Sequence, residues 1–98
     1  MVEVLWELKV KMDGDTIDVV FLRVPESEDF PEGIKYRAVY IRNNERLVGY
    51  DNAVHHGPGL RHHKHIRDRI VQYDFVDMWT LMSDFEEDMR KIRDGIMK

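Results

Sequence analysis

The first 24 residues alternate between apolar and polar side chains in the manner of a β-hairpin. From Val2 to Met12 every second residue is apolar and the residues between are charged, with Leu5 as the exception. A period of two predicts a strand with one buried face. Asp13-Gly14-Asp15 supplies residues suited to the positive φ angles of a tight turn. Thr16–Val24, rich in β-branched and aromatic residues, then predicts a second and more central strand.

A second hairpin follows the polar connection at Pro25–Gly33. Ile34–Arg42 alternates again and predicts the third strand, and Asn43-Asn44 predicts its turn. Arg46–Asp51 is the predicted fourth strand. Arg69–Tyr73 is a candidate for a short fifth strand.

Near the C-terminus, apolar side chains recur at alternating spacings of three and four residues, which predicts one amphipathic helix. This apolar stripe consists of Phe75, Met78, Met82, Phe85, Met89, Ile92 and Ile96. Asp74 is the predicted N-cap, with Asp77 in the acidic position of a capping box. A helix of about 22 residues would be about 33 Å long. Its part beyond Met89 is therefore expected to overhang the sheet, where it could contact a partner.

A sheet with one apolar face needs a cover, and the helix is the element that can provide it. The expected fold class is therefore α+β, with an antiparallel four- to five-stranded sheet packed against one long C-terminal helix. A chain of 98 residues forms one domain, here residues 1–98.

The composition narrows the classes of function. The net charge of -4 argues against a protein coated with basic residues for long nucleic-acid duplexes, although it leaves room for a local basic site. The chain has no cysteine, which excludes disulfides, thiolate metal ligands and a cysteine nucleophile, and fits a reducing cytoplasm. No apolar run approaches the roughly 20 residues that a membrane span needs, so no contact with the membrane is expected.

All five histidines lie between Tyr50 and His65, around a Gly57-Pro58-Gly59 hinge. Histidines that belong to a core are usually scattered, so this concentration indicates a functional loop. The histidines are His55, His56, His62, His63 and His65. Arginine and lysine residues are interleaved with the last three, which makes the second half of the loop basic.

Histidine exchanges protons near neutral pH, and neighbouring cations stabilise a reacting phosphate. This combination predicts a metal-independent ribonuclease that needs no cofactor. His63 and His65 are the predicted proton-transfer pair, with Asp51 orienting one ring and His62 as a substitute for either histidine. The residues expected to bind phosphate or RNA are Arg37, Arg61, Lys64, Arg67, Tyr36 and Tyr50.

Two other classes of function fit the same residues. His63 and His65 would share one face of an extended segment, and Asp51 or His55 could complete a set of three metal ligands for a metal-dependent hydrolase. The cations of the loop, Lys64 among them, would repel a metal ion and argue against that reading. A non-catalytic module that binds another protein through the helix and the loop is the third class.

Several of these segments resemble the small TumE family. The segments are Lys35-Tyr36-Arg37, Gly49-Tyr50-Asp51-Asn52, His63-Lys64-His65 and Tyr73-Asp74-Phe75-Val76-Asp77, followed by Leu81, Asp84 and Phe85. The resemblance covers most of the chain from about Lys35 onward. It implies a toxin of a type II toxin–antitoxin pair, whose partner is an antitoxin, commonly a helix-turn-helix protein. The Met-rich helix stripe could alternatively form a homodimer.

The loop departs from the family pattern in His55-His56 and Pro58, which leaves the roles of His55 and His56 open. The resemblance does not specify the reaction, so the ribonuclease prediction depends on the chemistry of the loop.

Overall fold

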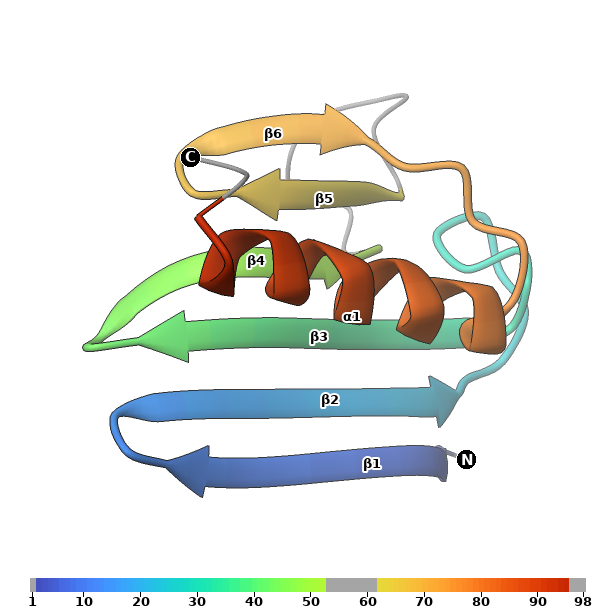
Figure 1. Cartoon of the computed structure of the whole chain (residues 1–98). Coiled ribbons are helices and arrows are strands. Elements are labelled where there is room, and N and C mark those ends of the chain that lie inside the picture. The colour runs from blue at the N-terminus through green and yellow to red at the C-terminus, as the bar shows by residue number, and fades with distance from the viewer. Residues whose placement is uncertain (1, 53–61, 96–98) are drawn as a thin grey trace.

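The computed structural model describes residues 2–52 and 62–95, which form one antiparallel sheet and one helix (Figure 1). The strands are β1 (Glu3–Met12), β2 (Asp15–Arg23), β3 (Ile34–Arg42), β4 (Glu45–Asp51), β5 (His63–Ile66) and β6 (Arg69–Gln72), and the helix is α1 (Met78–Arg93). The α+β class is confirmed, but the sheet has six strands instead of the expected four to five. No helix in the described ranges is long and apolar enough to cross a membrane.

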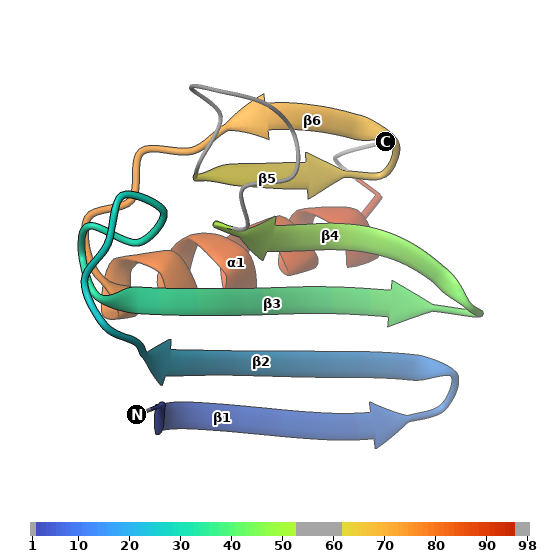
Figure 2. The same ribbon diagram turned by 180° about the vertical axis from the view of Figure 1, so that it is seen from behind.

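The strands follow one another across the sheet in chain order, each antiparallel to its neighbour (Figure 2). Both predicted turns are present. Gly14 takes a φ of 86°, and Asn43 and Asn44 take 51° and 66°. Asparagine tolerates this left-handed region better than most residues, which explains its place at the second turn.

Leu5, the exception in the alternating pattern of the first strand, is the extra residue of a β-bulge. Val4 pairs with Leu22 and Trp6 pairs with Phe21, so Leu5 has no partner of its own. A bulge allows two successive side chains to turn towards the same face. Leu5 and Trp6 therefore both pack against the core, while Val4 leaves the face on which it was predicted.

The predicted buried face of β1 is largely exposed. Leu8 is 37% exposed and Met12 63%. The physical reason is that β1 is an edge strand, whereas α1 lies over the middle of the sheet near β3 and β4 (Figure 1). The alternation of apolar and polar residues located the strand correctly. It could not show how much of the apolar face of this strand the helix would cover.

The second half of the histidine loop is a strand, β5, that the sequence analysis did not predict. The predicted fifth strand is β6, and a tight turn at Arg67-Asp68 joins the two. Arg67 takes a φ of 56° there. β5 lacks the apolar alternation that marks the other strands, because His63 and His65 occupy one of its faces and Lys64 shares the other with Ile66.

The helix begins at Met78, later than predicted, and has 16 residues. Asp77, not Asp74, is the N-cap, and its Oδ1 accepts a hydrogen bond of 2.7 Å from the Thr80 N–H. A 16-residue helix is about 24 Å long, shorter than the predicted 33 Å. The expected overhang past Met89 is not found in the described part of the helix, because Ile92 is still buried. Ile96 lies outside the described residues.

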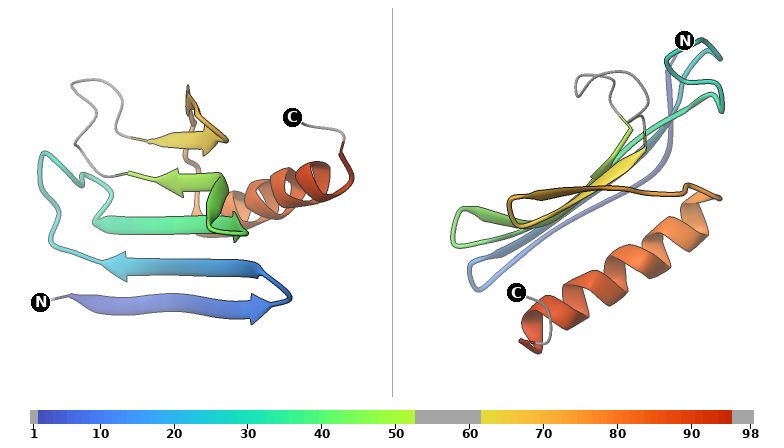
Figure 3. Two further views of the ribbon diagram at one scale, coloured as in Figure 1. Left: turned by 90° about the vertical axis from the view of Figure 1, so that its left-hand side faces the viewer. Right: turned by 90° about the horizontal axis from the view of Figure 1, so that it is seen from above.

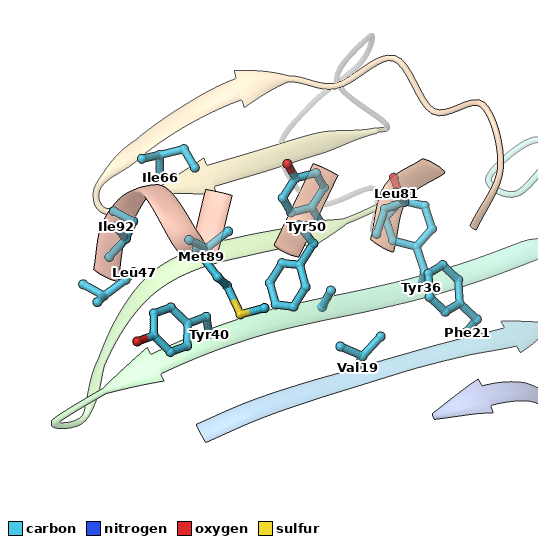
Figure 4. Packing of buried hydrophobic residues seen from close by; sticks show 13 residues of the cluster. Val19, Phe21, Tyr36, Tyr40, Leu47, Tyr50, Ile66, Leu81, Met89 and Ile92 are labelled. Carbon is cyan, nitrogen blue, oxygen red and sulfur yellow. The ribbon is translucent and has the colours of Figure 1, made fainter. Parts of the chain in front are cut away.

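The core lies between α1 and one face of the sheet, which we call the helix face (Figures 3 and 4). Tyr36 and Tyr40 of β3 and Tyr50 of β4 contribute large buried rings. From the helix, Leu81, Phe85, Met89 and Ile92 are buried against them. Opposite residues in an antiparallel pair share a face, so the strand register determines which side chains lie on the opposite, far face.

The cap of α1 should make stability depend on pH. The hydrogen bond from the Thr80 backbone N–H holds the pKa of the Asp77 carboxyl below its usual range. A lowered folded-state pKa stabilises the protein above the unfolded pKa, about 3.9, and this contribution is lost as the pH falls through the folded value.

In Asp77→Asn, a capping acceptor remains but the titrating group is gone. Urea unfolding should therefore show that the stability advantage of the parent over this variant shrinks between about pH 7 and about pH 3. A difference that stays constant across this range would contradict a role for the Asp77 charge.

Candidate functional site

A row of polar side chains crosses the far face of the sheet. Arg37 of β3 pairs with Asp51 of β4, Asp51 pairs with His63 of β5, and His63 pairs with Gln72 of β6. Side chains directly opposite in antiparallel strands have Cβ atoms about 5 Å apart. His65 lies two residues beyond His63 on the same face. The register therefore brings four of the predicted site residues together: Arg37, Asp51, His63 and His65.

Asp51, His63 and His65 form a compact cluster within this row. The Nε2 atom of His63 lies 3.0 Å from Oδ1 of Asp51. The two imidazole rings are 5.0 Å apart between centroids and cross at 80°. One nitrogen or oxygen atom from each of the three residues lies within 4.8 Å of the others. Both histidines are buried, at 0% and 6% exposure, so water competes weakly for these atoms.

Gly49 is paired with His65 of β5, and its lack of a side chain makes room for the side chain of Arg46. A Cβ atom at Gly49 would stand 3.1 Å from Cδ of Arg46, so the Arg46 side chain lies across the place where other residues carry a side chain. Arg46 and Gly49 were not among the site residues predicted from the sequence. The available signal was a glycine within a predicted strand, which often marks a close approach by another group.

Lys64 and Tyr50 lie on the helix face, away from the histidine pair. Lys64 Nζ is 3.2 Å from Oδ2 of Asp88, a buried residue of α1 that the sequence analysis missed. The Tyr50 O–H donates a hydrogen bond to the same oxygen. Burial first, and then the Asp88 hydrogen bond, raise the pKa of Tyr50 far above its ordinary value, so the phenol stays protonated. Lys64 and Tyr50 form an internal polar network here with Asp88, and their contact with RNA stays a prediction.

His62 and Tyr36 form a second group on the helix side. The Nδ1 atom of His62 is 2.8 Å from the Tyr36 hydroxyl, and its Nε2 atom is 3.0 Å from Oε2 of Glu32. The ring of His62 stacks on Phe75 at a centroid distance of 5.0 Å. Burial raises the pKa of Tyr36 well above its usual range, which excludes this phenol as a base at neutral pH. His62 is thus held by local partners and lies apart from His63 and His65.

Of the other predicted site residues, Arg67 is described and does not join the cluster. Arg67 lies in the β5–β6 turn, where Nη1 is 3.8 Å from Oε1 of Glu45. Arg61, His55 and His56 lie outside the described residues.

A pocket also opens on the helix side of the molecule. It is lined by Tyr50, Lys64, Tyr73, Asp84, Glu87, Asp88 and Lys91. Three carboxylates against two ammonium groups make its lining acidic, and Tyr73 donates a hydrogen bond of 2.6 Å to Asp84. An acidic lining repels phosphate, so this pocket is a poor place for RNA.

Comparisons with known proteins identify the family. Searches of curated proteins and of solved structures found no significant match. The family model described as Toxin TumE matches residues 3–93, which is most of the chain and includes the two N-terminal strands that lie before Lys35. The matched region contains the complete Asp51–His63–His65 cluster and the residues around it. The chain therefore belongs to the TumE toxin family.

Proposed function

We propose that this toxin cleaves RNA without a metal, and that Asp51, His63 and His65 form its reaction centre. The observation that carries the proposal is the side-by-side position of two imidazoles and a carboxylate on the far face, next to Arg37. Two histidines in reach of one phosphodiester are sufficient for general acid–base cleavage.

The reaction would use the ribose 2′-hydroxyl as its nucleophile. One neutral imidazole takes the proton from the 2′-hydroxyl while the 2′-oxygen attacks the adjacent phosphorus. The protonated imidazole of the other histidine gives its proton to the departing 5′-oxygen as the P–O5′ bond breaks. The products are a 2′,3′-cyclic phosphate and a free 5′-hydroxyl. Asp51, 3.0 Å from His63, orients that ring.

Arg37 and Arg46 are the proposed phosphate-binding residues. Both are exposed and both belong to strands next to the cluster. A guanidinium group offers paired N–H donors that match phosphate oxygens. Because His63 and His65 are buried, the proposal also requires that RNA binding open a path to them.

The residues on the helix face receive different roles from those first predicted. Lys64 and Tyr50 support the cluster indirectly, by fixing β4 and β5 against α1 through Asp88. Tyr36 and His62 hold the start of β5 against β3. In this proposal none of these four residues contacts the reacting phosphate.

Purified toxin incubated with total RNA tests the proposal. Cleavage should proceed equally well with and without a chelator, and the new 3′ ends should be cyclic phosphates. Cleavage that stops when the chelator is added would contradict the metal-free mechanism. RNA that stays intact under all conditions would contradict ribonuclease activity and favour a toxin that acts by binding another protein.

The family implies an antitoxin as partner. We propose, in addition, that this antitoxin is a helix-turn-helix protein and that the toxin and the antitoxin both act in the cytoplasm.

We also propose that the toxin forms a homodimer. The exposed side chains of Leu8 and Met12 on edge strand β1 support an interface there, since apolar edge strands favour pairing with another chain.

A further inference from the structure

His63 and His65 present two imidazoles from one face of a strand, and Asp51 presents a carboxylate from the strand beside it. Ligands at about 2.0–2.2 Å from one tetrahedral metal ion lie about 3.3–3.6 Å apart. The distance of 3.0 Å between His63 Nε2 and Asp51 Oδ1 is within roughly 0.5 Å of this range. All three ligand atoms lie within 4.8 Å of one another, so the widest pair needs to close by at most about 1.5 Å.

Of the loop cations that were expected to repel a metal ion, the two in the described part of the chain, Lys64 and Arg67, have their ion-pair partners away from the cluster. Lys64 stands between the two histidines in sequence, but its side chain points to the opposite face and contacts Asp88. Arg67 lies at the β5–β6 turn beside Glu45. Arg37 and Arg46 remain on or next to the far face, where they can hold an anion, and the Asp51 carboxylate supplies negative charge within the cluster.

The donor set selects the class of metal. Two imidazoles with one carboxylate suit Zn²⁺ and similar divalent transition metals, whereas Mg²⁺ and Ca²⁺ prefer oxygen ligands. Three protein ligands leave a fourth position for water or a substrate oxygen, as in catalytic zinc sites. Low exposure of both histidines reduces competition from bulk water.

From these observations we propose that Asp51, His63 and His65 bind one divalent transition-metal ion of the Zn²⁺ class. An imidazole lone pair that binds a metal cannot accept a proton. The metal is therefore an inhibitor of the acid–base ribonuclease, a consequence that rests on the proposed function, whereas metal binding itself does not.

Titration with Co²⁺ and Zn²⁺ tests the site directly. Co²⁺ should give the visible absorption of a four-coordinate nitrogen–oxygen site, and Zn²⁺ should displace it at one equivalent per chain. His65→Asn and Asp51→Asn should each weaken binding at least about 100-fold, because substitutions of outer-shell residues alone cost 10- to 100-fold. His62→Asn removes an imidazole that lies apart from the cluster and should bind the metal like the parent.

The fold of each variant is checked by its thermal transition, and Asp51→Asn serves if a histidine variant does not fold. Failure of the parent to bind Co²⁺ or Zn²⁺ would overturn the site. Equal loss of binding in His62→Asn would also overturn it, because the metal would then depend on residues outside the cluster.

RNA cleavage with and without Zn²⁺ separates the two proposals. Inhibition by Zn²⁺ at one equivalent supports both the metal site and the acid–base reaction. Metal binding together with cleavage that requires the metal supports the site and overturns the metal-free reaction. Cleavage that is unaffected by Zn²⁺ in a protein that binds no metal supports the reaction and overturns the site.

Discussion

Replacing His65 with alanine should lower the rate of RNA cleavage by about 10²–10⁴-fold, the usual contribution of one acid–base group. The reason is that His65 shares the far face with His63 and pairs with Gly49, across which the side chain of Arg46, a proposed phosphate-binding residue, lies. His63→Ala should have an effect of similar size. The measurement is single-turnover cleavage of a short RNA, accompanied by growth of cells that express the variant.

The control for this prediction is His62→Asn, which removes a histidine that does not belong to the cluster. Its cleavage rate should stay within a few-fold of the parent. Thermal transitions must show that each variant is folded, because His63 is completely buried and alanine there leaves a cavity. Folded His63→Ala and His65→Ala proteins that still cleave RNA and arrest growth would refute the assignment.

Asp88→Ala should lower the free energy of unfolding by about 3 kcal/mol, the low end of the range for breaking a buried ion pair. Asp88 accepts hydrogen bonds from Tyr50 and Lys64, and both donors would lose their partner. The low end of the range is expected because the Lys64 side chain is 26% exposed and can regain some hydration. Urea unfolding followed by circular dichroism gives the value.

A double-mutant cycle with Tyr50→Phe isolates the hydrogen bond to Asp88. If Tyr50 and Asp88 interact as in the structure, the double variant should be more stable than the sum of the single effects implies, by about 1 kcal/mol or more. Strict additivity would show that the contact contributes nothing. Asp88→Asn should cost less than Asp88→Ala, because an amide oxygen can still accept a hydrogen bond from Tyr50.

Much of the fold is a local property of the sequence. Period two located the first four strands, and residues that accept positive φ located the turns at Gly14 and at Asn43-Asn44. Period 3.6 located the helix. These signals are local because backbone preferences and the burial of one face both act within a few residues.

The predicted elements differ from the structure where tertiary contacts override the local pattern of apolar and polar residues. Leu5 looked like an irregularity and is a bulge residue that packs with Trp6. β5 has no apolar alternation, because buried histidines replace the usual aliphatic side chains. The helix begins after the N-cap Asp77, and Phe75, which was predicted to lie within the helix, precedes it and stacks on His62 and Tyr36.

Some features of the candidate site follow from local sequence patterns, and others depend on the tertiary structure. The sequence by itself determined that Arg37 and Asp51 belong to neighbouring strands, because alternation and chain order are encoded locally, whereas His63 and His65 share a face only if their segment is extended. Only the tertiary structure decided which partners stand beside them. The strand register placed Arg37, Asp51 and His63 in one row on the far face. On the opposite face, Lys64 and Tyr50 contact Asp88 of α1. A shift of one residue reverses the face of every side chain in a strand, so these neighbours depend on pairing between distant segments, which no local pattern specifies.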